Sequence, residues 1–102
     1  MKLIEINMQQ ILDLCKLHKV KTLSVFGSIL TGRFNNNSDV DMLVEFEPID
    51  HDTFDYFRNY FDLRDSLESL FNRKVDLIEE KGLRNKYFVA LINRTKRVIY
   101  GK

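Results

Sequence analysis

The chain has 102 residues, 44% of them hydrophobic and 30% charged, which predicts a single folded domain over residues 1–102 and leaves no length for a second one. One proline and four glycines exclude a collagen-like or low-complexity protein. Sixteen lysines and arginines against fifteen acids leave a net charge of +1, so no overall field attracts nucleic acid and no direct nucleic-acid partner is expected.

Cysteine usage and hydropathy predict a cytoplasmic location. Cys15 is the only cysteine in the sequence, which excludes an internal disulfide and favours a reducing compartment. No apolar run approaches the length needed to cross a bilayer, so no membrane association is expected.

Charge is distributed unevenly along the chain. Residues 38–80 hold thirteen acids and four bases, whereas residues 81–102 hold seven bases and no acid. The middle of the chain therefore favours cations, and the basic end favours anions such as a polyphosphate or an acidic partner.

The first predicted element is an amphipathic helix over residues 8–18. Asn7 followed by Gln10 has the spacing of a capping box, and apolar residues then recur at the helical period. The apolar face includes Cys15, which is therefore expected in the core.

Two strands are predicted next, over residues 22–26 and 40–46, and they end at Gly27 and Pro48. The connection between them is short for a parallel crossover, which needs about a dozen residues or more. The strands are therefore expected to be antiparallel neighbours, and this pairing brings Gly27 close to Asp39.

A long aromatic helix is predicted over residues 52–71, with Asp52 as its N-cap. Its apolar side chains cover an arc of about 200°, roughly twice what contact with one sheet requires. Tyr56, Tyr60 and Leu63 are expected to belong to this excess and to face solvent, a second copy of the chain or another protein. The helix is thus a candidate interface for a homo-oligomer or hetero-oligomer.

The rest of the sequence predicts a strand over residues 75–78, a helix over 84–93 and a terminal strand over 98–100. Helices therefore alternate with strands along the chain. This order indicates the α/β or α+β class, with a small mixed sheet flanked by helices.

Three carboxylates fall on or beside the predicted strands. Asp39 and Asp41 are two residues apart, which directs their side chains to the same face of the second strand. Asp76 interrupts an apolar run where a strand favours another apolar residue. Three acids on adjacent strands are able to hold two Mg²⁺ ions about 3.5 to 4 Å apart, an arrangement suited to phosphorus chemistry.

Gly27 and Ser28 supply a candidate anion site. A glycine at the end of a strand lets backbone N–H groups approach a phosphate, and the Ser28 hydroxyl adds a donor. Gly-Ser alone is usually a turn, and Asp-x-Asp alone is usually a solvated edge. Together, at this spacing, they predict a phosphate site facing a metal site.

This combination resembles the minimal nucleotidyltransferases of the DNA polymerase beta superfamily, whose signature is Gly-Ser, ten residues and then Asp-x-Asp. Here Gly27-Ser28 is followed by ten residues and Asp39-Val40-Asp41. The likeness continues through the long helix to a third strand that bears Asp76. The resemblance implies a polymerase beta-like nucleotidyltransferase fold for nearly the whole chain.

The resemblance also implies roles for these residues. Asp39 and Asp41 would bind both metal ions, and Asp76 would complete the metal site and help to activate the acceptor hydroxyl. Gly27 and Ser28 would hold the triphosphate. The implied reaction is attack by an acceptor on the α-phosphorus of a nucleoside triphosphate, with release of pyrophosphate.

One position departs from the family pattern. Many members carry Ala-Arg-Gly where this chain has Leu30-Thr31-Gly32. Arginine binds phosphate through two parallel hydrogen bonds, so its absence weakens the expected triphosphate site. Arg33, the next residue, is the candidate replacement; the alternative is that Arg33 is a solvated loop charge.

Small members of this family are commonly encoded beside a HEPN-domain protein, in toxin–antitoxin pairs whose antitoxin is the nucleotidyltransferase. The resemblance therefore implies a Mg²⁺-dependent protein adenylyltransferase that transfers AMP from ATP to a tyrosine of a HEPN toxin. Two alternatives stay open. One is nucleotidyl transfer to a small molecule such as an aminoglycoside, and the other is an antitoxin that acts by contact alone.

Overall fold

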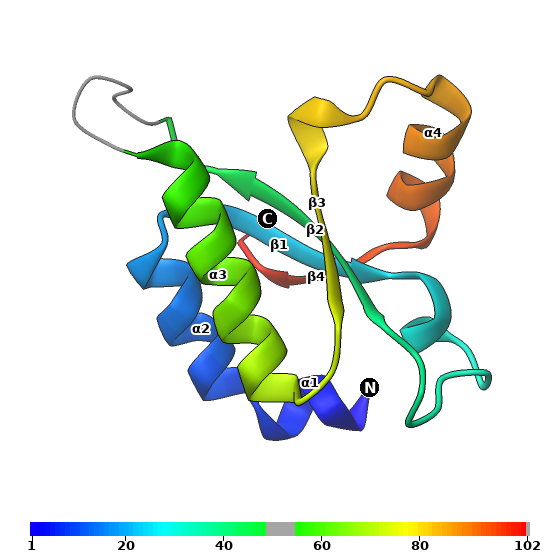
Figure 1. Cartoon of the computed structure of the whole chain (residues 1–102). Helices are drawn as coiled ribbons and strands as arrows, with labels where there is room; N and C mark the ends of the chain where they lie inside the picture. The colour runs from blue at the N-terminus through cyan, green and yellow to red at the C-terminus, as the bar shows by residue number, and fades with distance from the viewer. Residues whose placement is uncertain (49–54, 102) are drawn as a thin grey trace.

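The computed structural model describes residues 1–48 and 55–101. Within them, helices and strands are mixed along the chain, which confirms the predicted fold class (Figure 1). The elements are, in order, α1 (Lys2–Ile6), α2 (Met8–Leu17), β1 (Val20–Phe26), the 3₁₀ turn η1 (Gly27–Leu30), β2 (Val40–Phe46), α3 (Tyr56–Phe71), β3 (Val75–Glu79), the 3₁₀ turn η2 (Glu80–Gly82), α4 (Lys86–Thr95) and β4 (Arg97–Tyr100).

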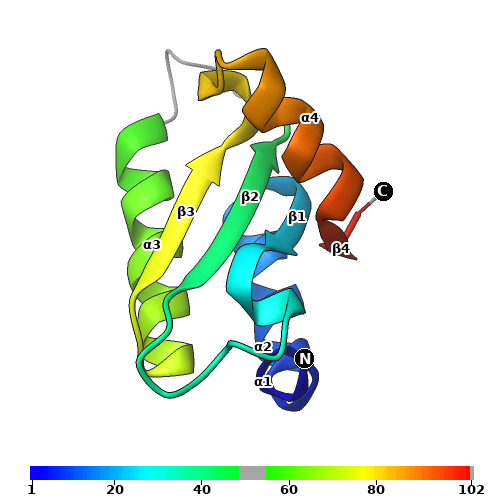
Figure 2. The ribbon, with the colours of Figure 1, turned by 90° about the vertical axis from the view of Figure 1, so that its right-hand side faces the viewer.

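The strands form one mixed sheet in the order β3-β2-β1-β4. β1 pairs antiparallel with both β2 and β4, which confirms the antiparallel pairing predicted for the first two strands. β2 and β3 run parallel, and α3 makes the crossover between them (Figure 2). The sheet therefore has one parallel pair, and that pair lies at its β3 edge.

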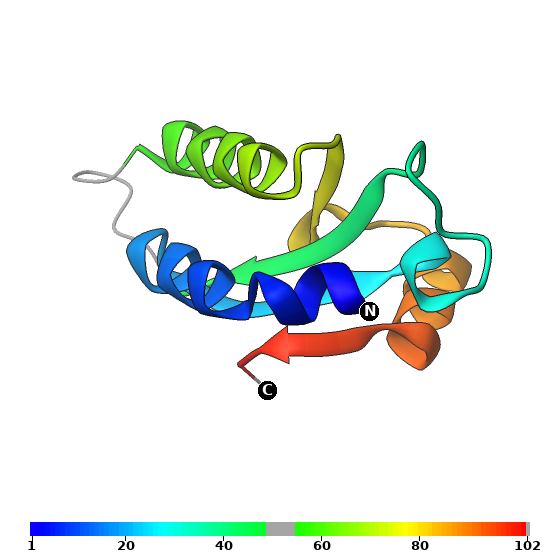
Figure 3. The ribbon, with the colours of Figure 1, turned by 90° about the horizontal axis from the view of Figure 1, so that it is seen from below.

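The two faces of the sheet are covered differently. On one face, α2 and α3 lie side by side (Figure 3), and Val40 and Met42 of β2 are fully buried beneath the helices. Leu43 points to the other face, where it packs with Ile92 of α4. This alternation is the two-residue period of a strand, and it directs Asp41 to the α4 face.

The N-terminal helix α1 is not among the predicted elements, although its Ile4 is fully buried in the core. Asn7 lies between α1 and α2, and its Nδ2 donates to the carbonyl of Leu3 at 2.9 Å. The predicted capping box is therefore wrong, because the Asn7 side chain closes the preceding helix and makes no cap hydrogen bond to α2. The helix predicted to follow Asn7 is present as α2.

α3 begins at Tyr56 in the structure, four residues after the predicted start. Its N-cap is Asp55, whose Oδ1 accepts a hydrogen bond from the backbone N–H of Arg58 at 3.1 Å. The predicted cap, Asp52, lies outside the described residues. Near the same end of α3, the buried Asn59 Nδ2 donates to the carbonyl of His18 at 2.8 Å, which joins the start of α3 to the end of α2.

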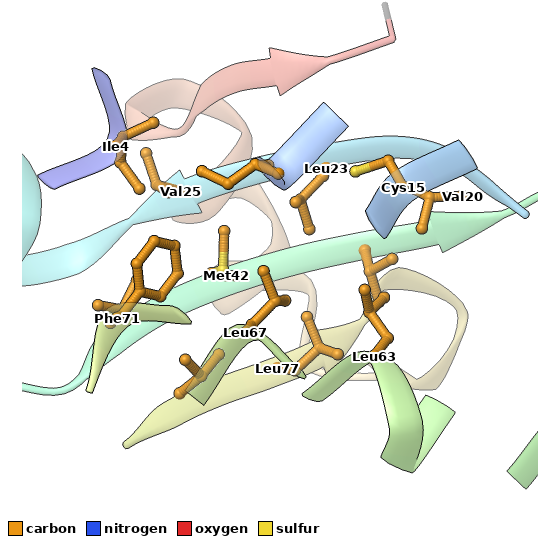
Figure 4. Close-up of a cluster of buried hydrophobic side chains, with 14 of the residues drawn as sticks. Ile4, Cys15, Val20, Leu23, Val25, Met42, Leu63, Leu67, Phe71 and Leu77 are labelled. Atoms are coloured by element: carbon orange, nitrogen blue, oxygen red, sulfur yellow. The ribbon is translucent and has the colours of Figure 1, made fainter. Parts of the chain in front are cut away.

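The side of α3 predicted to be surplus apolar surface packs against the sheet. Leu63 is fully buried in the main core (Figure 4), so the prediction that it is exposed is wrong. Tyr56 is half-buried and packs edge-on against Phe46 of β2, with ring centroids 5.5 Å apart. The hydroxyl of Tyr60 donates to the carbonyl of Leu77 in the edge strand β3. These three residues follow the i, i+4, i+7 spacing of a single helix face.

The exposed aromatic residues of α3 each follow one of the packed tyrosines by one position. Phe57 and Phe61 are 74% and 45% exposed, and the guanidinium of Arg64 lies 4.9 Å from the centre of the Phe61 ring. An oligomer interface on the helix predicted over residues 52–71 stays a prediction.

The C-terminal elements follow the predicted order. α4 begins two residues later than predicted because Asn85 is its N-cap. The Asn85 Oδ1 accepts from the backbone N–H groups of Tyr87 and Phe88 at 3.0 and 3.2 Å. None of the helices in residues 1–48 and 55–101 combines the length and the apolar character needed to cross a membrane.

Burial makes Cys15 a reporter of unfolding. Its side chain is fully buried, and this burial raises the pKa of the thiol to about 12. Because the thiolate is the reactive form, we expect almost no reaction with a thiol reagent such as Ellman's reagent at pH 8 in the native protein, and one equivalent per chain in concentrated guanidinium chloride. Rapid stoichiometric labelling of the native protein would show that Cys15 is accessible and contradict this packing.

Candidate active site

Two carboxylates lie side by side on the parallel strand pair. The register of β2 and β3 places Asp41 directly beside Asp76, and the register of β1 and β2 places Phe26, the last residue of β1, beside Asp41. The end of β1 therefore lies beside the start of β2, and the start of β3 lies on the other side of β2 (Figure 2). The sequence prediction that these acids occupy adjacent strands agrees with this register.

Gly27 is held against the Asp41 carboxylate. Its φ of +76° lies in the left-handed region, which glycine adopts without strain. A Cβ atom at this position would lie 2.5 Å from Asp41 Oδ2, which is far inside van der Waals contact. Both the backbone conformation and the space therefore require glycine, and they let the backbone that begins η1 approach the carboxylate.

The environment of Asp41 disfavours its negative charge. Burial raises the pKa of the Asp41 carboxyl, and the nearby negative charges of Asp76 and Asp39 raise it further. Asp39 and Asp76 are themselves exposed. A cation placed among these three groups would remove the repulsion that the protein leaves uncompensated.

Asp39 lies just outside the sheet, because β2 begins at Val40. The backbone N–H of Val40 donates to the carbonyl of Lys74 at 3.0 Å, which extends the parallel pairing to the residue before β3. The residue after Asp39, Val40, is therefore held by the sheet, whereas the position of Asp39 itself depends on the loop that precedes it. In the described part of the chain, no three His, Cys, Asp or Glu side chains are grouped closely enough to enclose a metal ion.

Thr31, the residue that departs from the family pattern, closes the η1 turn. Its hydroxyl donates to the carbonyl of Ser28 at 2.8 Å and accepts from the backbone N–H of Arg33 at 3.1 Å. Its backbone N–H also donates to Ser28 O at 2.9 Å. Thr31 therefore stabilises the turn that carries Gly27 and Ser28. The side chain of Arg33 is exposed, and within residues 1–48 and 55–101 its guanidinium has no partner.

A cavity of about 640 Å³ adjoins η1 on the α4 side, and sequence reasoning did not identify it. Its lining is mostly apolar and comes from β1, η1, α4 and the start of β4. The residues are Phe26, Gly27, Leu30, Thr31, Phe88, Leu91, Ile92, Thr95 and Arg97. The one signal in the sequence was the basic end of the chain, and the fold brings one of those bases, Arg97, to the same cavity as Gly27.

Carboxylates from two adjacent strands lie beside a glycine-led turn on a mixed sheet, as expected from the sequence. Residues 8–99 match the nucleotidyltransferase domain family. The chain therefore belongs to this family and is a nucleotidyltransferase.

Similar proteins agree with this assignment. A Methanocaldococcus jannaschii protein assigned by inference as a protein adenylyltransferase is 39% identical over 71 residues, which are 70% of this chain and 77% of that protein. The protein adenylyltransferase MntA of Thermococcus cleftensis is 35% identical over 66 residues, 65% of this chain and 62% of that protein.

Solved structures share the fold. A structure assigned by inference as a minimal nucleotidyltransferase has a TM-score of 0.74 and 28% identity, covering 92% of this chain and 90% of that one. A toxin–antitoxin structure with AMP-PNP has a TM-score of 0.70 and 23% identity, covering 94% and 74%. An MNT antitoxin in complex with a tri-AMPylated HEPN toxin from Shewanella oneidensis has a TM-score of 0.64 and 20% identity, covering 96% and 72%.

Replacing Gly27 with alanine should disturb the site directly. A side chain at φ +76° costs about 1–2 kcal/mol, and its Cβ must displace the Asp41 carboxylate. We expect G27A to lower the melting temperature and to weaken AMP-PNP binding, measured by calorimetry with Mg²⁺, about tenfold or more.

The matched control is G32A, because a Cβ at Gly32 meets no atom within 4 Å. It should bind AMP-PNP as the unchanged protein does. Equal affinity in G27A and G32A would show that the contact between Gly27 and Asp41 has no part in nucleotide binding.

Proposed function

We propose that this protein is a Mg²⁺-dependent protein adenylyltransferase that transfers AMP from ATP to a tyrosine hydroxyl of a HEPN-domain toxin and thereby acts as its antitoxin. The observation that carries the proposal is the pairing of Asp41 with Asp76, with Gly27 packed on the Asp41 carboxylate. The cytoplasm, where a lone buried cysteine stays reduced, is the proposed location.

The three carboxylates suit Mg²⁺ that is shared with the substrate phosphates, and they do not suit a metal ion that is bound by protein ligands alone. Asp39, Asp41 and Asp76 offer only oxygen donors, and their mutual repulsion at Asp41 favours a cation. They do not enclose an ion among the described residues, which fits a metal that binds through one or two carboxylates and the phosphates of the substrate. Two such ions, when bound, would neutralise phosphate charge during transfer.

The chain's own groups supply the remaining steps. The backbone N–H groups of Gly27 and Ser28 and the Ser28 hydroxyl would hold the β- and γ-phosphates. The exposed guanidinium of Arg33 would neutralise the terminal phosphate in place of the arginine replaced by Thr31.

In the transfer step, the tyrosine oxygen forms a bond to the α-phosphorus, the bond from that phosphorus to the bridging oxygen breaks, and pyrophosphate leaves. The phenolic proton passes to the carboxylate of Asp76.

The choice of acceptor rests on related proteins. The Thermococcus relative is named a protein adenylyltransferase, and a structural neighbour is an antitoxin bound to an AMPylated HEPN toxin. A folded partner protein that brings its own tyrosine is therefore favoured as the acceptor over a small molecule such as an aminoglycoside.

Loss of a site carboxylate should abolish transfer without loss of fold. In D41N, the side chain keeps its shape but one of three crowded negative charges is removed, so we expect an unchanged or slightly higher melting temperature. Intact-mass spectrometry of a HEPN partner, incubated with ATP and Mg²⁺, should show added AMP with the unchanged protein and none with D41N or with the double variant D39A/D41A.

E45Q is the matched control, because Glu45 lies on the same strand and is half-buried, but within residues 1–48 and 55–101 its ion pair is with Lys21, at 4.0 Å. It should transfer AMP normally. If D41N still transfers AMP, the catalytic assignment is wrong. If neither the unchanged protein nor any of the variants transfers AMP, but all of them bind and neutralise the partner, the protein is an antitoxin that acts by contact.

A further inference from the structure

The loop over residues 33–39 carries Asp39 to the site, although Asp39 lies outside the sheet and is exposed. The loop has internal hydrogen bonds around Asn35. The Asn35 Oδ1 accepts from the backbone N–H of Asn37 at 2.8 Å, and the backbone of Asn35 exchanges hydrogen bonds with Ser38 at 3.0 Å. These bonds shape the loop, but they do not fix its position relative to β3.

Arg73, which lies 34 residues beyond Asp39 in the turn between α3 and β3, makes that connection. One guanidinium nitrogen, Nη1, donates to the carbonyls of both Asn35 and Ser38, each at 2.9 Å. The guanidinium also lies over the ring of Phe34, 4.7 Å from its centre. A single side chain therefore contacts the loop near its beginning, at Phe34 and Asn35, and near its end, at Ser38.

The peptide groups on both sides of Asp39 are fixed by consecutive residues. The Ser38 carbonyl, which precedes Asp39, accepts from Arg73 at 2.9 Å. The Val40 N–H, which follows Asp39, donates to the carbonyl of Lys74 at 3.0 Å. The residues before and after Asp39 are thus both hydrogen-bonded to the turn between α3 and β3.

That turn is itself firmly placed. Asn72 ends α3 in the left-handed conformation, with φ of 53°, and the backbone N–H of Arg73 donates to the Glu68 carbonyl at 3.3 Å. The Glu68 carboxylate accepts from the backbone N–H of Val75 at 3.0 Å. The turn is therefore anchored to both α3 and β3, and Arg73 transmits this rigidity to the loop.

We propose that Arg73 is a positioning residue that fixes Asp39 relative to Asp41 and Asp76. The role of Asp39 in transfer rests on the proposed function, whereas the anchoring of the loop does not. Catalytic groups must be held to within about 0.5 Å, and a misplacement of about 1 Å reduces rates by about a hundredfold. Arginine suits the position because its planar group stacks on Phe34 while donating to two carbonyls.

The test compares R73A and R73K with R64A. Arg64 is a matched control because it also lies over a phenylalanine ring and its replacement removes the same charge, whereas its hydrogen bonds within the described residues go to Asp65. Two readouts are needed: backbone amide hydrogen exchange without ligands, and the rate of AMP transfer to the HEPN partner at saturating ATP over a range of Mg²⁺ concentrations.

We expect R73A to increase amide exchange about tenfold or more at residues 35–40, with little change in the centre of β1. Its maximal transfer rate should fall about tenfold or more, and its half-saturating Mg²⁺ concentration should rise. R73K should recover part of both effects, and R64A should match the unchanged protein.

Unaltered exchange at residues 35–40 in R73A would overturn the proposal. So would an increase in exchange that is equal across the whole sheet, because this would show a general loss of stability. A normal transfer rate in R73A, with the loop exchanging faster, would also overturn it. If the unchanged protein itself transfers no AMP, the proposed function fails, while the exchange data still decide whether Arg73 fixes the loop.

Discussion

The site depends on the parallel pairing of β2 with β3, because this register alone brings Asp41 beside Asp76. β3 is an edge strand, so its position is set by β2 on one side and by α3, whose Tyr60 hydroxyl donates to the Leu77 carbonyl. A slip of one residue would turn Asp76 toward the main core and expose Leu77. The buried apolar residues of β3 therefore hold the acid in place, and burial energy is what keeps two negative charges adjacent.

The same alternation that builds the core also leaves the site on the less covered face. The helices α1, α2 and α3 cover one face of the sheet, whereas α4 covers the other only in part, with Ile92 as its buried contact. The carboxylates and Gly27 lie on this second face, beside the cavity between η1 and α4. In the proposed function, the nucleotide and the acceptor tyrosine approach from this face without disturbing the main core.

The strands and the spacing of the acids were predictable from the sequence, because strand period and short connections are local properties. Other features were not, and three of them show why. α1 is one short helix turn without its own periodic signal, so only the burial of Ile4 explains it. The exposed side of α3 was misplaced by one residue, since an arc of apolar residues does not show which part meets the sheet. Arg73 acts through contacts more than 30 residues away in the sequence, which no local pattern reveals.

The central claim is that a metal–nucleotide complex binds at the start of β2 and β3. Its most direct test is to add Mn²⁺ with AMP-PNP to the isotope-labelled protein and map paramagnetic broadening of the backbone amide signals. We predict that broadening centres on Gly27, residues 39–41 and Asp76, and spares α2, which lies on the opposite face of the sheet. Broadening centred elsewhere, or unchanged in D39A/D41A, would contradict it.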